Sequence, residues 1–456
     1  MSETFKGLER GDRLMVMGFG VSGRAALNFG LAMGAEVMVS DNALKEKQTP
    51  ILLDQLESEG VSCEWGGHSL DFLSRGDVIF VSPGIAWDNS LLEELRSQGK
   101  SVLGELELGA SMIREKVIGV TGTNGKTTVT RLIGELLRAS GKKVFVGGNI
   151  GTPLLDYLSG SERADILVLE LSSFQLEAVK TFSADIALLL NITPDHLDRH
   201  GDMEGYAAAK AKIFGGESKG ALAILCGDDP LCRDLASRMK EREVMLFGHD
   251  EDCTARVVEA TIHLECSGSQ EFYEVAGTRL GTRTGCLNSA AALLAARHAG
   301  ADPAGVRKGL AEFMPDRHRV EFVAEKNGVS YFNDSKATNS GALISGLENF
   351  PEKVILIAGG REKGEDFSVL RKTIAEGVKF MVVIGEAADA LEKALGDVVE
   401  TKSAVNLKEA LRLAADRGVE GDTVLLSPAC SSFDQFTNYQ KRGDVFCRLV
   451  TELEEV

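Results

Sequence analysis

The feature that most constrains the fold is a glycine-rich segment joining an apolar run to a helical one. It reads Gly-Val-Thr-Gly-Thr-Asn-Gly-Lys-Thr-Thr and spans residues 119–128. Successive backbone N–H groups and the first turn of the following helix can surround a polyphosphate. Lys126 can pair with the outer phosphates, and the Thr127 hydroxyl can bind Mg²⁺. The first glycine of a strict Walker A pattern is replaced by Val120. We predict a phosphate-binding loop here, rather than a surface turn that carries a lysine.

Short apolar runs alternate with helical sequence along the chain, as at 14–17, 36–40 and 78–81. Continuous apolar strands of this kind are typical of parallel sheets covered on both faces. Between residues 244 and 275 the runs alternate polar with apolar, which predicts antiparallel strands. A chain of 456 residues is too long for one core. We therefore predict three α/β units, the second opening at Val117 and the third near Pro315.

Polar side chains follow several apolar runs, where parallel strands reach the edge that binds ligands. Glu170 ends such a run and suits Mg²⁺ beside a phosphate-binding loop. His196 lies in an acidic loop after the next run, and its residue type leaves a ligand role and a structural role both open. From the surrounding sequence alone, Lys210 is interpreted as a lysine on a helix surface. Three further polar segments follow strands later in the chain, at 333–339, 359–363 and 427–436.

The amino-terminal segment Gly-Phe-Gly-Val-Ser-Gly, residues 18–23, fits a dinucleotide-binding fingerprint. Asp41 ends the next apolar run, at the spacing expected for an acid that contacts a ribose. Taken alone, this pattern predicts an NAD-dependent oxidoreductase. The same loop can hold the diphosphate of another nucleotide, so both interpretations stay open at this point.

Composition excludes some classes of function. A formal net charge of -18 argues against a general nucleic-acid binder, because such binding needs a basic surface. The eight cysteines include no Cys-x-x-Cys pair, so we expect reduced, mostly buried thiols rather than a zinc site or disulfides. The start of the chain lacks the apolar core of a signal peptide, and no apolar run is long enough for a spanning helix. We expect a cytoplasmic protein without membrane insertion.

Six motifs, in their order along the chain, resemble those of the Mur ligases of peptidoglycan synthesis. The resemblance extends from end to end, and it is the combination of the motifs that is specific. They are Gly122–Thr128, Gly147–Gly151, Leu169–Glu177, Asp195–Arg199, Asn333–Asn339 and Leu426–Cys430.

The resemblance implies a fold and a reaction. Residues 1–107 would form a Rossmann-like domain that binds a UDP-linked substrate, and residues 108–314 a P-loop ATPase-like domain with a mixed sheet. Residues 315–456 would form a second Rossmann-like domain, which binds the amino acid and closes over ATP. The enzyme would use ATP and two Mg²⁺ ions to join D-glutamate to UDP-N-acetylmuramoyl-L-alanine through an acyl phosphate. We expect a monomer.

The resemblance also assigns residues. Those expected to act directly in catalysis are Lys126, His196 and Lys210. ATP would be held by Gly122, Thr123, Asn124, Gly125, Lys126, Thr127, Thr128, Asn288, Arg319 and Asp334. The metal ligands would be Thr127, Glu170, His196 and a carbamylated Lys210. The UDP-linked substrate would contact Gly20, Val21, Ser22, Asp41, Asn42, Gly84, Asn149, Ser172, Ser173 and Gln175. D-glutamate would contact Lys336, Thr338, Lys363, Ser432, Phe433 and Tyr439.

One departure from the family pattern concerns the adenine side of the ATP site. The family usually carries His-Asn where this chain has Thr284-Gly285, three residues before Asn288. Alternatives to the predicted reaction are a family member that adds another amino acid, an NAD-dependent dehydrogenase, and a non-catalytic nucleotide-binding module. Within the family, Lys363 with Ser432 and Phe433 favours glutamate.

Overall fold

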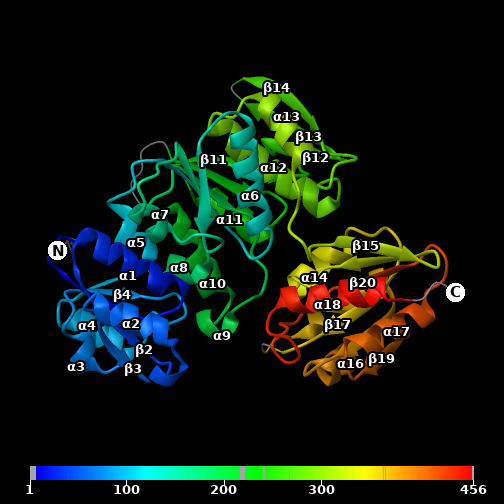
Figure 1. Ribbon diagram of the computed structural model, residues 1–456. Coiled ribbons are helices and arrows are strands. Elements are labelled where there is room, and N and C mark those ends of the chain that lie inside the picture. Colours follow the sequence, from blue (N-terminus) through cyan, green and yellow to red (C-terminus); the bar gives the residue numbers. More distant parts are fainter. Residues whose placement is uncertain are drawn as a thin grey trace.

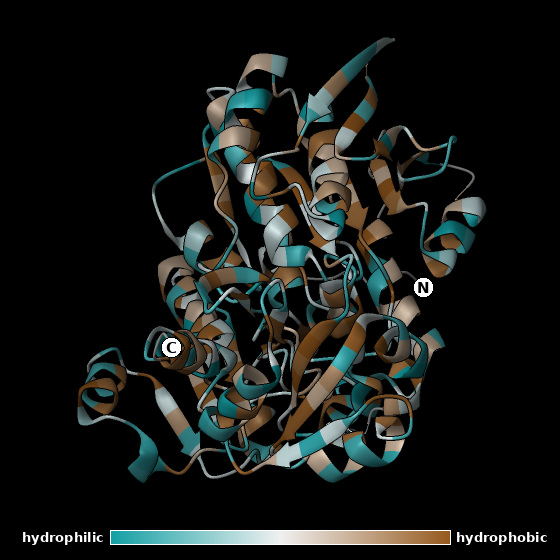
Figure 2. Ribbon diagram, turned by 90° about the vertical axis from the view of Figure 1, so that its right-hand side faces the viewer, coloured by the Kyte–Doolittle hydropathy of each residue, from teal (hydrophilic) through white to brown (hydrophobic). Residues whose placement is uncertain are grey.

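The computed structural model describes residues 7–215, 221–239, 242–266, 268–362, 364 and 366–453. Three sheets follow one another along the chain, within the three predicted domain ranges, and Figure 1 shows them as successive colour blocks. The first predicted boundary, between residues 107 and 108, falls inside helix α5 (Glu105–Ala110). Hydrophobic colour concentrates on the strands, whereas the outer helix faces are hydrophilic (Figure 2).

The N-terminal domain is a five-stranded parallel sheet in the order β3-β2-β1-β4-β5. Its central strands are apolar on both faces, as helices covering both sides of a parallel sheet require. The strands are β1 (Arg13–Met17), β2 (Glu36–Asp41), β3 (Ser62–Trp65), β4 (Val78–Val81) and β5 (Ser101–Leu103). The other helices are α1 (Val21–Met33), η1 (Lys45–Lys47), α2 (Pro50–Ser58), α3 (Leu70–Leu73) and α4 (Ser90–Ser97).

The central domain has a mixed nine-stranded sheet in the order β14-β13-β12-β11-β10-β9-β6-β8-β7, and the strands from β11 back to β7 run parallel. Strands β12 to β14 pair antiparallel, as the alternating sequence predicted. The strands are β6 (Lys116–Thr121), β7 (Val144–Gly148), β8 (Ile166–Glu170), β9 (Ile186–Leu189), β10 (Leu222–Cys226), β11 (Glu243–Gly248), β12 (Ala255–Val258), β13 (Thr261–Cys266) and β14 (Ser269–Glu274). The helices are α6 (Lys126–Ala139), α7 (Leu154–Ser159), α8 (Ser173–Glu177), α9 (Leu197–His200), α10 (Met203–Ala211), η2 (Lys212–Phe214), α11 (Pro230–Arg238), α12 (Arg283–His298) and α13 (Pro303–Glu312).

The C-terminal domain has a six-stranded sheet in the order β15-β16-β20-β17-β18-β19, in which only β15 is antiparallel to its neighbour. The fold is therefore the predicted three-domain α/β arrangement. The strands are β15 (Glu321–Lys326), β16 (Val329–Asn333), β17 (Val354–Gly359), β18 (Val378–Ile384), β19 (Thr401–Ala404) and β20 (Thr423–Leu426). The helices are α14 (Ser340–Leu347), η3 (Phe367–Leu370), α15 (Arg371–Gly377), α16 (Ala388–Leu395), α17 (Leu407–Arg417) and α18 (Tyr439–Thr451).

The first two domains share one core. Their buried apolar side chains form a continuous cluster that extends from Leu8, before β1, to Phe313 after α13. Glu107 strengthens this junction, because its carboxylate accepts the backbone N–H groups of residues 180–182. The C-terminal domain instead has separate clusters on the two faces of its sheet. It meets the rest of the protein through polar loops at the site described below.

Two expectations from composition can be compared with the structure. Six of the eight cysteines are buried, as predicted, and none of these eight described residues forms a disulfide. Burial raises the pKa of the Cys226 thiol to about 12, so this group stays protonated near neutral pH. Among the described residues, no helix is both long enough and apolar enough to cross a bilayer.

Candidate functional site

The predicted phosphate-binding loop connects β6 to α6. Gly122 and Gly125 have φ values of 151° and 84°, which only glycine adopts readily. A Cβ atom on Gly122 would lie 2.9 Å from the Cβ of Leu190, so the loop packs closely on the neighbouring β9 loop. Asn191 fixes that approach by accepting the N–H groups of Thr123 and Asn124 through its Oδ1 atom. The N-terminus of the 14-residue helix α6 is therefore held at the carboxyl edge of the sheet.

Two lysine ammonium groups converge on one carbonyl of this loop. Lys126 Nζ lies 2.9 Å and Lys210 Nζ 2.7 Å from the Gly122 oxygen. Lys210 is 1% exposed, so the interpretation of this residue as a helix-surface lysine is wrong. Burial lowers the pKa of Lys210 well below its usual value, and the nearby Lys126 lowers it further. Burial is also the main cause of the lowered pKa of Lys126. The arrangement places two lysine side-chain amines, both with a lowered pKa, beside a loop suited to anions.

Glu170 ends β8, which lies next to β6 in the sheet, and is 2% exposed. Its Oε1 atom accepts the Asn149 side-chain amide at 2.9 Å, whereas Oε2 has no hydrogen-bond partner among the described residues. An orphaned buried carboxylate oxygen is costly unless a ligand satisfies it. A hard cation shared with the Thr127 hydroxyl fits this oxygen. The described residues contain no cluster of three His, Cys, Asp or Glu side chains that could hold a metal without such help.

The loop after β9 carries Asp195 and His196 to the same edge. His196 has a left-handed backbone with φ 54°, its ring lies 4.9 Å from the Phe174 ring, and its side chain is 39% exposed. Asp195 accepts the side-chain amide of Asn339 at 3.0 Å. Asn339 also caps α14, so this bond joins the central domain to the C-terminal domain.

The segment that follows β8 is held by local hydrogen bonds. Ser172 and Gln175 form a capping box at the start of α8, and Ser173 contacts the ring of His200 at 3.0 Å. The Gln175 amide also donates to Glu105 at the start of α5. Of the residues expected to contact the UDP-linked substrate here, Asn149 is exposed and Gln175 is buried. Their roles toward that substrate stay predictions.

A cavity lies between the central and C-terminal domains, and it brings together most of the residues predicted for ATP. It is lined by Asn124, Gly125, Thr128, Asn288, Arg319, Asp334 and Lys336, with residues of the 279–285 and 342–349 segments. Lys336 Nζ lies 3.4 Å from the Thr127 hydroxyl and 5.4 Å from the centre of the Tyr439 ring. Lys336 therefore adjoins the phosphate-binding loop, and burial lowers its pKa to about 7.

Asp334 is 6% exposed and sits at the end of β16. It accepts hydrogen bonds from Ser427 Oγ at 2.8 Å and from the Val320 N–H group at 3.3 Å. Burial nevertheless raises its pKa to about 7, because these bonds and the nearby Arg319 and Arg442 compensate only part of the lost hydration.

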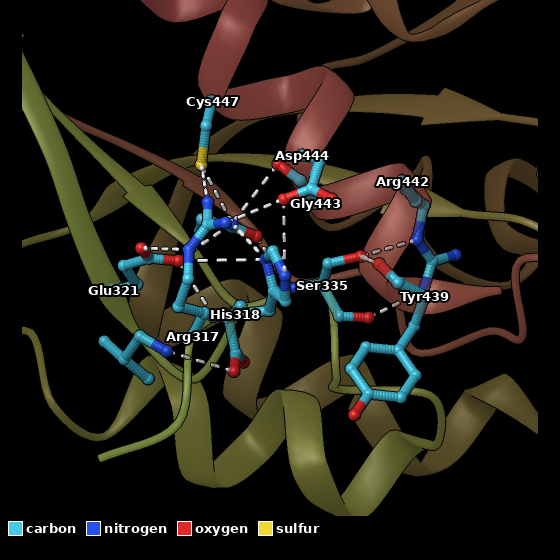
Figure 3. A network of polar contacts seen from close by, with 12 residues as sticks. Arg317, His318, Glu321, Ser335, Tyr439, Arg442, Gly443, Asp444 and Cys447 are labelled. Atoms are coloured by element: carbon cyan, nitrogen blue, oxygen red, sulfur yellow. Dashed lines mark hydrogen bonds and ion pairs between the residues drawn. The ribbon is translucent and has the colours of Figure 1, made fainter. Parts of the chain in front are cut away.

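Arg319 is flanked by two residues with unusual backbones. His318 has φ 68° and Val320 has φ 46°, and a positive φ is a genuine outlier for a β-branched residue. Hydrogen bonds hold this turn in place, since Glu321 accepts the His318 N–H (Figure 3). The Asn333 side chain also contacts the His318 ring at 2.8 Å. The Arg319 Nε atom is buried without a partner among the described residues. Arg319 lines the cavity with this Nε atom left without a partner among those residues.

Arg442 is not marked by any sequence motif, yet its side chain connects several loops in the C-terminal half of the site. It is 1% exposed and donates hydrogen bonds to Ser335 (Figure 3). It also donates to the carbonyls of Gly359, which ends β17, and Cys430, which follows β20. Burial lowers its pKa to about 10. In the sequence it is one basic residue among several in a helix, so no local pattern could have identified it.

The residues predicted for D-glutamate are spread over two loops of the C-terminal domain. Ser432 is 2% exposed and Phe433 is 60% exposed, while Thr338 and Tyr439 are half-buried. Tyr439 begins α18, and its carbonyl accepts the Ser335 hydroxyl. Lys363 lies outside the described residues, and its role stays a prediction.

The amino-terminal fingerprint lies between β1 and α1, and its residues Gly20 and Val21 are exposed. Asn42, which follows β2, is exposed as well. Asp41 uses both carboxylate oxygens to accept the N–H groups of Phe19 and Ala43. Ser22 is half-buried and adjoins Glu105, whose pKa burial raises. The exposed Gly84 follows β4 in the neighbouring loop. These residues surround the carboxyl edge of the first sheet, where open α/β sheets bind nucleotides.

Three α/β domains, a phosphate-binding loop and a polar cavity between the second and third domains define a three-domain P-loop protein. Family descriptions match each domain in turn: "Mur ligase MurD-like, N-terminal domain" at residues 12–104, "Mur ligase middle domain" at 120–296 and "Mur ligase, glutamate ligase domain" at 318–430. The chain belongs to the Mur ligase family.

Relatives and solved structures agree with this membership. The UDP-N-acetylmuramoylalanine–D-glutamate ligase of Desulfotalea psychrophila is 50% identical over 441 residues, covering 97% of this chain and 96% of the relative. The ligase of the same name from Koribacter versatilis is 42% identical, covering 98% of each chain. The crystal structure of MurF ligase from Thermotoga maritima in complex with ADP has a TM-score of 0.61 at 20% identity, covering 98% of this chain and 96% of that one. At that identity the structural likeness supports the fold alone.

Proposed function

We propose that this enzyme uses ATP to join the alanyl carboxylate of UDP-N-acetylmuramoyl-L-alanine to the amine of D-glutamate. The names of relatives that match almost the whole chain support this substrate pair. The structural observation that carries the proposal is the meeting of two domains at the phosphate-binding loop, where Lys336 contacts Thr127. A reaction between a nucleotide and two further substrates needs such a closed, multi-domain site.

ATP would bind in the cavity between the central and C-terminal domains, with its phosphates on the loop 122–128. Lys126 would leave the Gly122 and Thr123 carbonyls and pair with the outer phosphates. Arg319, whose Nε atom has no partner among the described residues, would supply a second cation. Asp334 would bind the ribose or position Arg319.

The residues at the loop fit Mg²⁺, with Thr127 and Glu170 as the proposed ligands of one ion and His196 and carbamylated Lys210 serving another. Bound there, Mg²⁺ would neutralise charge on the phosphates during transfer. Lys210 fits carbamylation because burial lowers its pKa, and only a neutral amine adds to CO₂. The product is an anion with oxygen donors, which a hard cation accepts.

A carboxylate is a poor electrophile, so the reaction needs an activated acyl group. An oxygen of the alanyl carboxylate would form a bond to the γ-phosphorus, while the bond from that phosphorus to ADP breaks. The neutral amine of D-glutamate would then attack the acyl carbon. The resulting tetrahedral intermediate collapses with release of inorganic phosphate, and the amine proton passes to a base or to solvent. Contacts such as Asn339 to Asp195 would exclude water from the acyl phosphate.

The other two substrates would approach from opposite sides of the phosphate-binding loop. The uridine diphosphate would lie on the loop at Gly20 to Ser22, near Asp41, Asn42 and Gly84. Its sugar and peptide would extend past Asn149, Ser172 and Ser173 toward Glu170. The carboxylates of D-glutamate would be held by Thr338, Lys363, Ser432, Phe433 and Tyr439. Since nucleotide-linked sugars and ATP are cytoplasmic metabolites, we propose that the enzyme acts in the cytoplasm.

The proposal is tested by ADP release in the presence of UDP-N-acetylmuramoyl-L-alanine and one amino acid at a time. We expect release with D-glutamate, and little with L-glutamate, L-alanine, L-lysine or diaminopimelate. The Lys126→Ala variant is the matched control for background hydrolysis and should show no turnover while keeping its thermal unfolding temperature. Equal ADP release with every amino acid, or normal turnover by this variant, would refute the proposal. Stabilisation by NAD but not by UDP-sugars would instead favour a dehydrogenase.

A further inference from the structure

The wall of the interdomain cavity away from the phosphate-binding loop includes Thr284, Gly285, Ser345 and Asn349. The Thr284 hydroxyl donates to the Ser345 carbonyl at 3.2 Å, and Gly285 has no side chain. A Cβ atom on Gly285 would lie 2.4 Å from the Leu280 carbonyl oxygen, so this backbone has no room for a larger residue. Thr284 therefore offers a base only the acceptor capacity of its hydroxyl oxygen, and Gly285 offers no side chain.

Asn349 is a polar side chain on this wall with a buried acceptor that the described part of the chain does not use. It follows α14 and lines the cavity with Ser345 and Thr284. Its Nδ2 atom donates to the carbonyls of Ser345 at 2.8 Å and Gly346 at 3.1 Å, which fixes the orientation of the amide. The opposite atom, Oδ1, is buried and has no hydrogen-bond partner among the described residues.

A buried carbonyl oxygen without a donor is destabilising, and most buried polar atoms in proteins have a partner. Two other orphaned buried atoms, Arg319 Nε and Glu170 Oε2, belong to the same proposed ATP and metal site. An orphaned acceptor beside them calls for a ligand that donates a hydrogen bond. The 6-amino group of adenine is such a donor, whereas the 6-carbonyl of hypoxanthine or guanine would place one acceptor against another.

We infer that Asn349 is a specificity-determining residue that recognises the 6-amino group of adenine through its Oδ1 atom. The inference rests on the proposed function, because it assumes that the nucleotide lies in this cavity with its phosphates on the loop 122–128. The Nδ2 atom keeps both of its backbone acceptors in this arrangement. Because Oδ1 is buried, the base reaches it only when neighbouring atoms of the cavity wall move aside. Selectivity for adenine then comes from the C-terminal domain, at the end of α14.

The test is to measure nucleotide affinity by isothermal titration calorimetry with three probes: ADP, purine riboside diphosphate, which lacks only the 6-amino group, and IDP. The wild-type protein should bind ADP about tenfold more tightly than either of the other two, as one buried hydrogen bond allows. In Asn349→Ala and Asn349→Leu the ratio between ADP and purine riboside diphosphate should fall to near one. Because the ratio compares two ligands on the same protein, a general weakening of the site does not change it.

The matched control is Glu348→Gln, at the adjacent exposed position, whose carboxylate lies 3.8 Å from Arg283. It should keep the wild-type ratio. An unchanged ratio in both Asn349 variants, or a wild-type protein that binds the three diphosphates equally, would overturn the inference. Ligation assays run in parallel separate the two proposals: selective ADP binding without any ADP-forming turnover would refute the proposed function and leave the role of Asn349 intact.

Discussion

Asp334→Asn is expected to stabilise the protein at high pH. Burial raises the pKa of Asp334 from 3.8 to about 7. Between these two values the folded state holds a proton that the unfolded chain has lost, so stability falls as pH rises through this range. Each pKa unit corresponds to about 1.4 kcal/mol, and the whole shift therefore costs about 4 kcal/mol above pH 7. Between about pH 5 and about pH 8 the cost is about 2 to 3 kcal/mol.

Asparagine at this position removes the titrating proton and keeps an oxygen that can accept from Ser427. The variant should match the wild type near pH 5, and its free energy of unfolding should exceed that of the wild type by about 2 to 3 kcal/mol near pH 8. For a domain of this size that difference is about 5 to 10 °C in Tm. Activity should fall, because Asp334 lies in the proposed ATP site.

Differential scanning calorimetry on the nucleotide-free protein is the appropriate assay. Both tryptophans, Trp65 and Trp87, lie in the N-terminal domain, so their fluorescence would not report on this site. The control is Asp397→Asn, an exposed acid of the same domain whose pKa the Arg371 guanidinium lowers, so that it does not titrate in this window. If Asp334→Asn showed the same change of Tm with pH as the wild type, the reasoning from burial would be refuted.

Three further variants test the phosphate and metal site. Lys210→Ala should lose nearly all turnover and be partly rescued by a short carboxylic acid that replaces the carbamate oxygens; failure of any rescue in the ADP-release assay would contradict the proposed carbamylation. Glu170→Gln keeps the bond to Asn149 but should raise the Mg²⁺ concentration for half-maximal activity by about tenfold or more, and an unchanged Mg²⁺ titration would remove Glu170 from the metal site. Gly125→Ala forces a side chain into φ 84°, with its Cβ 2.6 Å from Asn288 Oδ1; calorimetry should show a loss of about 1 to 3 kcal/mol, and wild-type stability would argue against the close approach of Asn288.

The architecture was predictable from sequence because the pattern of apolar and polar residues indicates most of the strands and how they pair. Apolar runs such as 14–17 and 78–81 became buried parallel strands, and the alternating stretch from 244 to 275 became the antiparallel edge of the central sheet. The phosphate-binding loop was also visible, because its glycines are required by backbone geometry that few other residues adopt.

The side-chain contacts across domains were not predictable from local pattern. Lys210 lies in an alanine-rich helix with no polarity signal, and only the fold reveals that its amine is buried against the Gly122 carbonyl. No local sequence pattern marks Arg442 or Asn349 either. Both side chains donate to backbone carbonyl groups, and these are positioned only once the chain has folded. The resemblance to the family assigned a role to Lys210 but none to Asn349.

The central claim is that ATP activates the alanyl carboxylate as an acyl phosphate. It is tested most directly by a single-turnover reaction with UDP-N-acetylmuramoyl-L-alanine whose alanyl carboxylate carries heavy oxygen. We expect one labelled oxygen in the inorganic phosphate, formed together with ADP, because the carboxylate oxygen that attacks phosphorus leaves with it. Unlabelled phosphate, or label in AMP, would contradict the account.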